Sequence, residues 1–165
     1  MYTYKIAKIE NLKEIIEVKN DVKQKIIEEG LQIWQNGYPQ DELLEEDIIK
    51  GYGRIVVVED EIVAYASYYP ALYDYDEGTF PNDEVMSFGR IMTKVGHTKK
   101  GYCSFLVEQM IKETKEKKIP GMGILVDEFN KKALNIYIKH GFKRIGVGTF
   151  PWAVLDIYYL PFDNE

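Results

Sequence analysis

Hydrophobic and polar residues along this chain follow two spacings, one typical of strands and the other of helices. Short alternating or β-branched runs, bounded by charged residues or glycine, predict strands. These runs occupy residues 3–9, 54–58, 62–69, 85–93, 122–126, 142–147 and 154–160. Hydrophobic residues at helical spacing predict helices over 12–27, 41–50, 102–118 and 130–140. The alternation of these elements predicts one mixed α/β domain spanning residues 1–165.

Within this order, the segment from Val85 to Val126 has the form strand, loop, helix, strand, as in a right-handed crossover. Its loop, from His97 to Ser104, ends a strand and opens a helix. The first turn of a helix leaves N–H groups unpaired and carries partial positive charge, which suits a phosphate. Gly101 allows close approach of the backbone, and Lys99 and Lys100 add positive charge. The alternative interpretation is a plain turn with solvated lysines, since the loop lacks the P-loop and dinucleotide fingerprints.

Composition narrows the class of protein. The chain has 165 residues, of which 45% are hydrophobic and 29% charged, and a net charge of -6. This is a soluble globular composition, and the acidic balance argues against a general nucleic-acid binder. A single cysteine, Cys103, excludes an intramolecular disulfide. No secretory signal or membrane-length apolar run is visible, so we expect a cytoplasmic protein that binds no membrane.

A second motif lies downstream of the loop. Asn130, Ala133, the pair Ile136-Tyr137 and the pair Gly141-Phe142 follow one another on and after the last predicted helix. With the upstream segment at Thr93 and 98–103, this pattern resembles the GNAT (GCN5-related N-acetyltransferase) superfamily. The resemblance covers about residues 5–159. It implies a mixed, mostly antiparallel central sheet of about seven strands with splayed central strands, flanked by about four helices.

The same resemblance implies an acetyl-CoA-dependent N-acetyltransferase and gives roles to individual residues. The backbone of Ile91, Met92 and Thr93 would pair with the pantetheine arm of acetyl-CoA. Asn130 would bind the pantetheine region. Tyr137 would lie near the thioester sulfur and protonate the leaving thiolate, which is reasonable for a phenol with a pKa of about 10. The pyrophosphate would be held by the N–H groups of Thr98, Lys99, Lys100, Gly101, Tyr102, Cys103 and Ser104.

Two residues depart from the family pattern. Thr98 replaces the usual Arg or Gln, and Cys103 replaces Gly or Ala, so both bear on cofactor affinity. They leave open a non-catalytic acyl-CoA sensor on the same fold, and a structural protein without any cofactor is a third reading. Cys103 could also act as a nucleophile, with its pKa lowered by the helix terminus and nearby lysines. That role needs a positioned base, for which neighbouring His97 is possible, but nothing else supports a triad.

The acceptor side is less defined. An attacking amine must lose a proton, and a carboxylate commonly takes it. The candidate bases of the loop before the strand 85–93 are Asp76, Glu77, Asp83 and Glu84, of which Glu84 is taken as the catalytic one, and Glu128 is a further candidate. Acidic and aromatic residues would suit a cationic amine, whereas Arg90 would favour an acceptor that carries a carboxylate. The candidate acceptor-binding residues are Trp34, Tyr38, Asp76, Glu77 and Arg90, with a solvated acidic loop as the alternative interpretation of 70–84.

The remaining expectations concern partners. No spaced cluster of His and Cys is present, so we expect no metal. The acceptor is expected to be a small-molecule or peptide amine, and its identity and the acyl-chain preference stay open. The apolar run 154–159 could pair within the sheet or across a homodimer.

Overall fold

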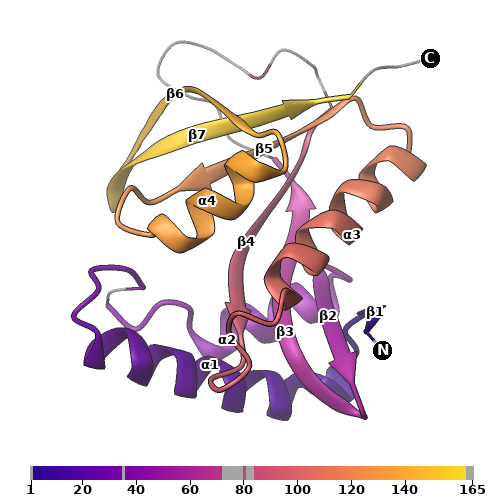
Figure 1. Ribbon diagram of the computed structural model, residues 1–165, viewed down its shortest axis with the longest axis vertical. Helices are drawn as coiled ribbons and strands as arrows, with labels where there is room; N and C mark the ends of the chain where they lie inside the picture. The colour runs from indigo at the N-terminus through magenta and orange to yellow at the C-terminus, as the bar shows by residue number, and fades with distance from the viewer. Residues whose placement is uncertain (1, 35, 72–79, 81–83, 163–165) are drawn as a thin grey trace. The chain divides into compact units, whose positions relative to one another are not determined.

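The computed structural model describes residues 2–34, 36–71, 80 and 84–162. Seven strands form one mixed, mostly antiparallel sheet in the order β1-β2-β3-β4-β5-β7-β6, and four helices flank it (Figure 1). The predicted fold class is therefore confirmed. Contacts along the chain gather in two compact units. The first comprises Met1–Tyr68 and Arg90–Val107, and the second comprises Tyr69–Gly89 and Glu108–Glu165.

The predicted elements all occur, most with boundaries within a few residues. The strands are β1 (Thr3–Ile6), β2 (Gly53–Val58), β3 (Glu61–Pro70), β4 (Met86–Thr93), β5 (Gly121–Val126), β6 (Lys143–Phe150) and β7 (Ala153–Pro161). The helices are α1 (Leu12–Glu28), α2 (Asp41–Ile49), α3 (Tyr102–Glu116) and α4 (Lys131–Lys139), with a short 3-10 turn at Ile9–Asn11.

The first strand is shorter than the sequence predicts. β1 ends at Ile6, and the 3-10 turn takes up the end of the predicted strand. The Asn11 side chain explains the early end, because its Oδ1 accepts a hydrogen bond of 2.8 Å from the Lys8 N–H. Such a local side-chain bond to the backbone competes with strand pairing.

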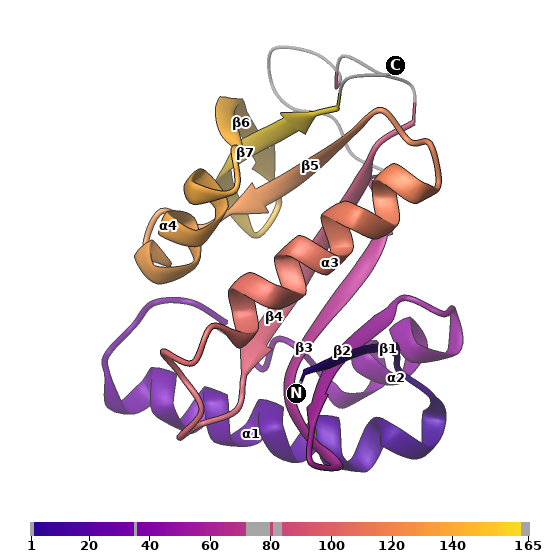
Figure 2. The same cartoon turned by 45° about the vertical axis from the view of Figure 1, so that its right-hand side comes forward.

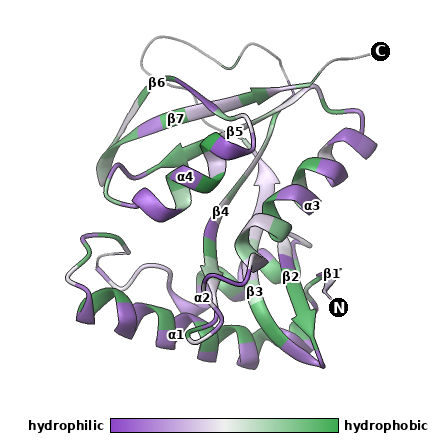
Figure 3. Cartoon of the chain, viewed as in Figure 1, coloured by the Kyte–Doolittle hydropathy of each residue, from purple (hydrophilic) through white to green (hydrophobic). Residues whose placement is uncertain are grey.

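In the first unit, α1 and α2 pack against β2, β3 and the end of β4 through one hydrophobic core. Figure 2 shows the two helices beside these strands, and Figure 3 shows most of β2 and the first part of β3 as hydrophobic. β2 pairs antiparallel with both β1 and β3. The buried core residues are Ala7, Ile15, Val18, Leu44, Ile48, Ile55, Ile62, Tyr65 and Met92. This core holds the strand end at Met92 against both helices.

In the second unit, β7 pairs antiparallel with β5 on one side and β6 on the other. β4 begins here and runs parallel to β5, with Met86 opposite Met122. α4 turns Ala133 and Tyr137 inward. A smaller core is formed by Phe80, Val85, Ile157 and Tyr159.

Replacing Gly53 with alanine is expected to lower the free energy of unfolding by about 1–3 kcal/mol, because the site is closely packed. A Cβ at this position would lie 2.8 Å from the Cβ of Ala7 and 3.1 Å from Ile48 Cγ1. Ala7 cannot yield by a rotamer change, and its N–H is bonded to the Gly53 carbonyl at 3.0 Å. Urea unfolding measures the loss. The double variant Ala7→Gly, Gly53→Ala is the control, and if it regains no stability the steric explanation is wrong.

Candidate active site

The end of β4 leads into α3 through a loop of residues 94–101, visible in Figures 1 and 2. The Lys94 N–H donates to the Val63 carbonyl at 2.8 Å, and the His97 N–H donates to the Lys94 carbonyl at 2.9 Å. Gly96, Lys99 and Gly101 have φ values of +89°, +67° and +81°. The chain therefore turns sharply before the helix, and at Gly101 only glycine adopts this backbone without strain.

The loop ends at the N-terminus of α3. The first helical hydrogen bond runs from the Phe105 N–H to the Gly101 carbonyl at 2.9 Å. The N–H groups of Tyr102 and Cys103 lie ahead of this ladder, in the turn where a helix offers donors to an anion. A Cβ built on Gly101 meets nothing within 4 Å, so the backbone is open on that side. The loop therefore combines an open glycine turn with the N–H donors of a helix N-terminus.

Side chains from distant segments hold this loop in place. The Tyr2 hydroxyl donates to the Lys100 carbonyl at 3.0 Å, and the Tyr2 ring meets Tyr102 edge-on, with centroids 4.8 Å apart. Lys94 is ion-paired with Glu61, whose pKa is held below its usual value by the hydrogen bond and charge of Lys94. These anchors were not predicted, because nothing local in sequence marks a contact between Tyr2 and Lys100.

The loop also carries a polar atom that has no partner in the part of the chain that the structure describes. His97 Nε2 lies 3.6 Å from Glu61 Oε1, whereas its Nδ1 is buried without a hydrogen bond. Buried polar groups are normally satisfied, so a water or a bound ligand is the expected partner of Nδ1. Thr98, Lys99 and Lys100 are exposed around it.

The strand before the loop is fixed by its side chains. Met92 is buried in the core of the first unit, at 3% exposure. Ile91 and Thr93 are half-buried, and they face the opposite side of the strand because side chains alternate. Met92 thereby anchors in the core the strand end whose backbone is predicted to meet the pantetheine arm.

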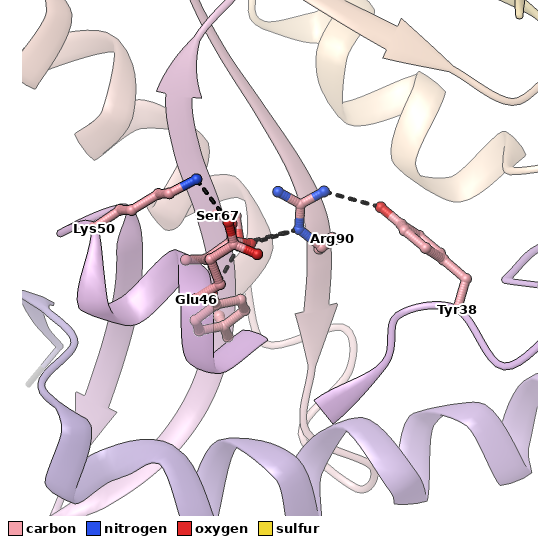
Figure 4. A network of polar contacts seen from close by, with 7 residues as sticks. Tyr38, Glu46, Lys50, Ser67 and Arg90 are labelled. Carbon is pink, nitrogen blue, oxygen red and sulfur yellow. Dashed lines mark hydrogen bonds and ion pairs between the residues drawn. The ribbon is translucent and has the colours of Figure 1, made fainter. Parts of the chain in front are cut away.

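Arg90 lies in the same strand, directly before Ile91, and at the centre of a polar network (Figure 4). Its φ of +51° is unusual for a residue other than glycine. The Nε donates to Asp47 Oδ2 at 2.7 Å and, at 3.3 Å, to Ser67 Oγ. The Nη1 donates to the Tyr38 hydroxyl at 3.1 Å. Arg90 and Tyr38, predicted separately for the acceptor side, are therefore in contact, and Asp47 and Ser67 join them without having been predicted.

Trp34 lies in the same connection as Tyr38, between α1 and α2. It is half-buried and packs against the core of the first unit. Trp34 also lines a surface hollow of about 290 Å³, together with residues of α1 and of the connection between α1 and α2. The lining residues are Lys23, Ile26, Ile27, Leu31, Ile33, Trp34, Asn36 and Gly37. The hollow is mainly apolar.

The second unit holds the other predicted residues. Asn130 begins α4, with its carbonyl accepting from the Leu134 N–H at 3.0 Å. Tyr137 is buried, at 5% exposure, and its ring meets those of Phe88 and Phe142 at 5.4 and 6.2 Å. Glu84 and Glu128 are exposed. Asp76, Glu77 and Asp83 lie outside the described residues.

Cys103 differs from the sequence expectation. Burial raises the pKa of its thiol to about 12. The expectation that the helix terminus and lysines would lower this pKa is wrong, because desolvation of the enclosed thiol outweighs them. The neutral thiol is a poor nucleophile, so this finding weighs against covalent catalysis by Cys103.

Alkylation of Cys103 by iodoacetamide at pH 8 is expected to be at least about a hundredfold slower than that of an ordinary cysteine with a pKa near 8.5. The unfolded chain ionises this thiol above about pH 8.5 while the folded protein keeps it protonated, so its contribution to stability falls as the pH rises above that value. Mass spectrometry follows the adduct, with urea-unfolded protein as the control. Equal rates for folded and unfolded protein would contradict the raised pKa.

Comparisons with known proteins agree with this geometry. The acetyltransferase (GNAT) family model matches residues 20–142, and the chain belongs to this family. No curated protein matches the chain significantly in sequence. Family membership makes the chain an acyltransferase in its general activity. Among the helices that the structure describes, none has the length and apolar character needed to cross a membrane.

Solved structures place the chain in the same fold. A GNAT-family acetyltransferase from Streptococcus agalactiae 2603 superposes with a TM-score of 0.82 at 18% identity, covering 99% of this chain and 96% of that one. PaiA N-acetyltransferase from Thermoplasma acidophilum, in complex with coenzyme A, gives 0.72 at 18% identity, covering 98% and 99%. The ribosomal-protein-S18-alanine N-acetyltransferase from Escherichia coli gives 0.72 at 12% identity, covering 100% and 96%.

Proposed function

We propose that this protein transfers an acetyl group from acetyl-CoA to a primary amine of a small molecule or peptide by direct attack. The observation that carries the proposal is the loop 94–101, which brings a glycine-containing turn to the N-terminus of α3 in a member of the acetyltransferase (GNAT) family. Helix N-termini of this kind bind phosphate groups. The coenzyme A complex of the Thermoplasma neighbour supports the same donor.

The donor site uses mainly backbone groups. The N–H groups from Thr98 to Ser104 hold the pyrophosphate, and the exposed Lys99 and Lys100 add positive charge. The backbone of 91–93 pairs with the pantetheine arm, and Asn130 orients it. The two departures from the family pattern cost little: Thr98 leaves the loop backbone intact, and Cys103 is half-buried with a thiol whose pKa is raised by burial to about 12, so it adds no negative charge beside the phosphates.

The chemistry requires one proton to leave the amine and another to reach the sulfur. A neutral amine attacks the thioester carbonyl, and a backbone N–H of the strand stabilises the negative charge that develops on oxygen. The Tyr137 hydroxyl protonates the departing thiolate, as a phenol of comparable basicity can. Glu84 takes the amine proton, directly or through a water molecule. Glu84 is exposed, so both an amine and water can reach it.

Calorimetric titration with acetyl-CoA, followed by a panel of amines assayed for release of free coenzyme A, tests the proposal. Saturable 1:1 binding with release that depends on an amine is the expected result. Binding without release for any amine favours the acyl-CoA sensor. Absence of binding at millimolar acetyl-CoA means that the donor site is degenerate.

A further inference from the structure

We infer that Asp47 is a positioning residue that controls the acceptor side through Arg90. Asp47 holds Arg90 against Tyr38, which fixes the connection between α1 and α2, and it takes up the positive charge of Arg90. The acceptor favoured is then an amine without a neighbouring carboxylate. This inference rests on the proposed function and names the class of acceptor for that site.

Asp47 and Arg90 form an ion pair that is almost fully enclosed. Arg90 Nε lies 2.7 Å from Asp47 Oδ2, and the two side chains are only 14% and 6% exposed. A pair this enclosed is screened little by water or salt, so the charges largely cancel each other. A carboxylate on a substrate would have to compete with Asp47 for the same guanidinium.

Two hydroxyl groups of β3 support Asp47. The Ser67 hydroxyl donates to Asp47 Oδ2 at 2.7 Å, and the Tyr65 hydroxyl lies 2.8 Å from Ser67 Oγ. Since Ser67 gives its proton to Asp47, Tyr65 must be the donor to Ser67. Burial raises the pKa of Tyr65 to about 12, which keeps it a donor. These two hydrogen bonds hold the Asp47 carboxylate, which belongs to α2, from the side of β3.

Arg90 also contacts Tyr38. Arg90 Nη1 donates to the Tyr38 hydroxyl at 3.1 Å (Figure 4). The phenol oxygen uses a lone pair in this contact, so its own proton is left to donate elsewhere. Tyr38 is half-buried, and Trp34 lies four residues before it. Arg90 is thus the link between the strand of the donor site and the connection that carries both aromatic residues.

Asp47→Asn tests the selectivity, with Glu46→Gln as the matched control. Glu46 is the adjacent residue of α2. Its replacement by glutamine removes the same charge as Asp47→Asn, but Glu46 pairs with Lys50, at 2.8 Å, and not with Arg90. We expect Asp47→Asn to shift the ratio of kcat/KM for tyrosine to that for tyramine at least about tenfold toward tyrosine, because the charge of Arg90 is no longer taken up. The Kd of acetyl-CoA stays within about twofold, and Glu46→Gln keeps the wild-type ratio. An unchanged ratio in Asp47→Asn overturns the selectivity.

Acrylamide quenching of Trp34, in a Trp152→Phe background, tests the positioning without any turnover. We expect Asp47→Asn and Tyr38→Phe to increase quenching, and Glu46→Gln to leave it unchanged. Tyr38→Phe removes one half-buried hydrogen bond, so it serves where Asp47→Asn fails to fold. Unchanged quenching in both variants overturns the positioning. A wild-type protein that acetylates no amine contradicts the proposed function, while the quenching result still decides whether Asp47 positions the connection.

Discussion

Replacing Tyr137 with phenylalanine is expected to lower kcat by about 10²–10⁴-fold while leaving the Kd of acetyl-CoA within about twofold. This is the range that a positioned general acid contributes. Phenylalanine keeps the ring contacts with Phe88 and Phe142, so the fold should survive the change. Release of coenzyme A, followed with a thiol reagent, gives kcat, and calorimetry gives the Kd.

Tyr158→Phe is the matched control for this experiment. Tyr158 is a buried tyrosine of the same unit, at 8% exposure, to which the proposed reaction gives no role. We expect it to retain kcat. If Tyr137→Phe also keeps the wild-type kcat, the leaving thiolate needs no acid from this residue, and the assignment of Tyr137 is wrong.

Gly101→Glu is expected to weaken acetyl-CoA binding at least about a hundredfold. The substitution places a side chain where φ is +81°, which costs about 1–2 kcal/mol for a residue with a Cβ. It also sets a negative charge beside the N-terminus of α3, where the pyrophosphate is proposed to bind. Gly101→Ala separates the two effects, because it carries the strain without the charge.

Gly51→Glu provides the matched control. Gly51 follows α2, has a φ of +80° and, like Gly101, would place a Cβ with nothing within 4 Å. We expect it to lower stability by a similar amount and to leave the Kd of acetyl-CoA unchanged. If Gly101→Glu also binds acetyl-CoA normally, the pyrophosphate lies somewhere other than the loop 94–101.

Much of the fold could be predicted from local sequence, and the reason is periodicity. The stripe that includes Ile15 predicts α1, and the run 54–58 predicts β2, because burial on one face repeats with the geometry of the element. The end of β1 could not be predicted in this way. It depends on one side-chain hydrogen bond between Asn11 and the Lys8 N–H.

The candidate site likewise has a part formed by contiguous residues and a part formed by residues far apart in the sequence. The loop and helix start from Gly96 to Ser104 are contiguous, so glycine placement and the family resemblance predict them together as a phosphate loop. Asp47 and Arg90 are 43 positions apart, and an aspartate in an amphipathic helix looks like any solvated residue. Only the packing of α2 against β3 and β4 shows that this carboxylate is buried. The sequence therefore showed no sign of the partners of Arg90, although it put Arg90 forward as a candidate acceptor-binding residue.

The enclosed pair of Asp47 and Arg90 also has a consequence for laboratory evolution of acceptor scope. Changing either residue alone breaks this enclosed pair, which lowers stability. A library that varies one position at a time would therefore favour variants that keep the pair, whatever the effect of the other changes on the acceptor. Randomising codons 47 and 90 together also samples residue pairs that compensate each other.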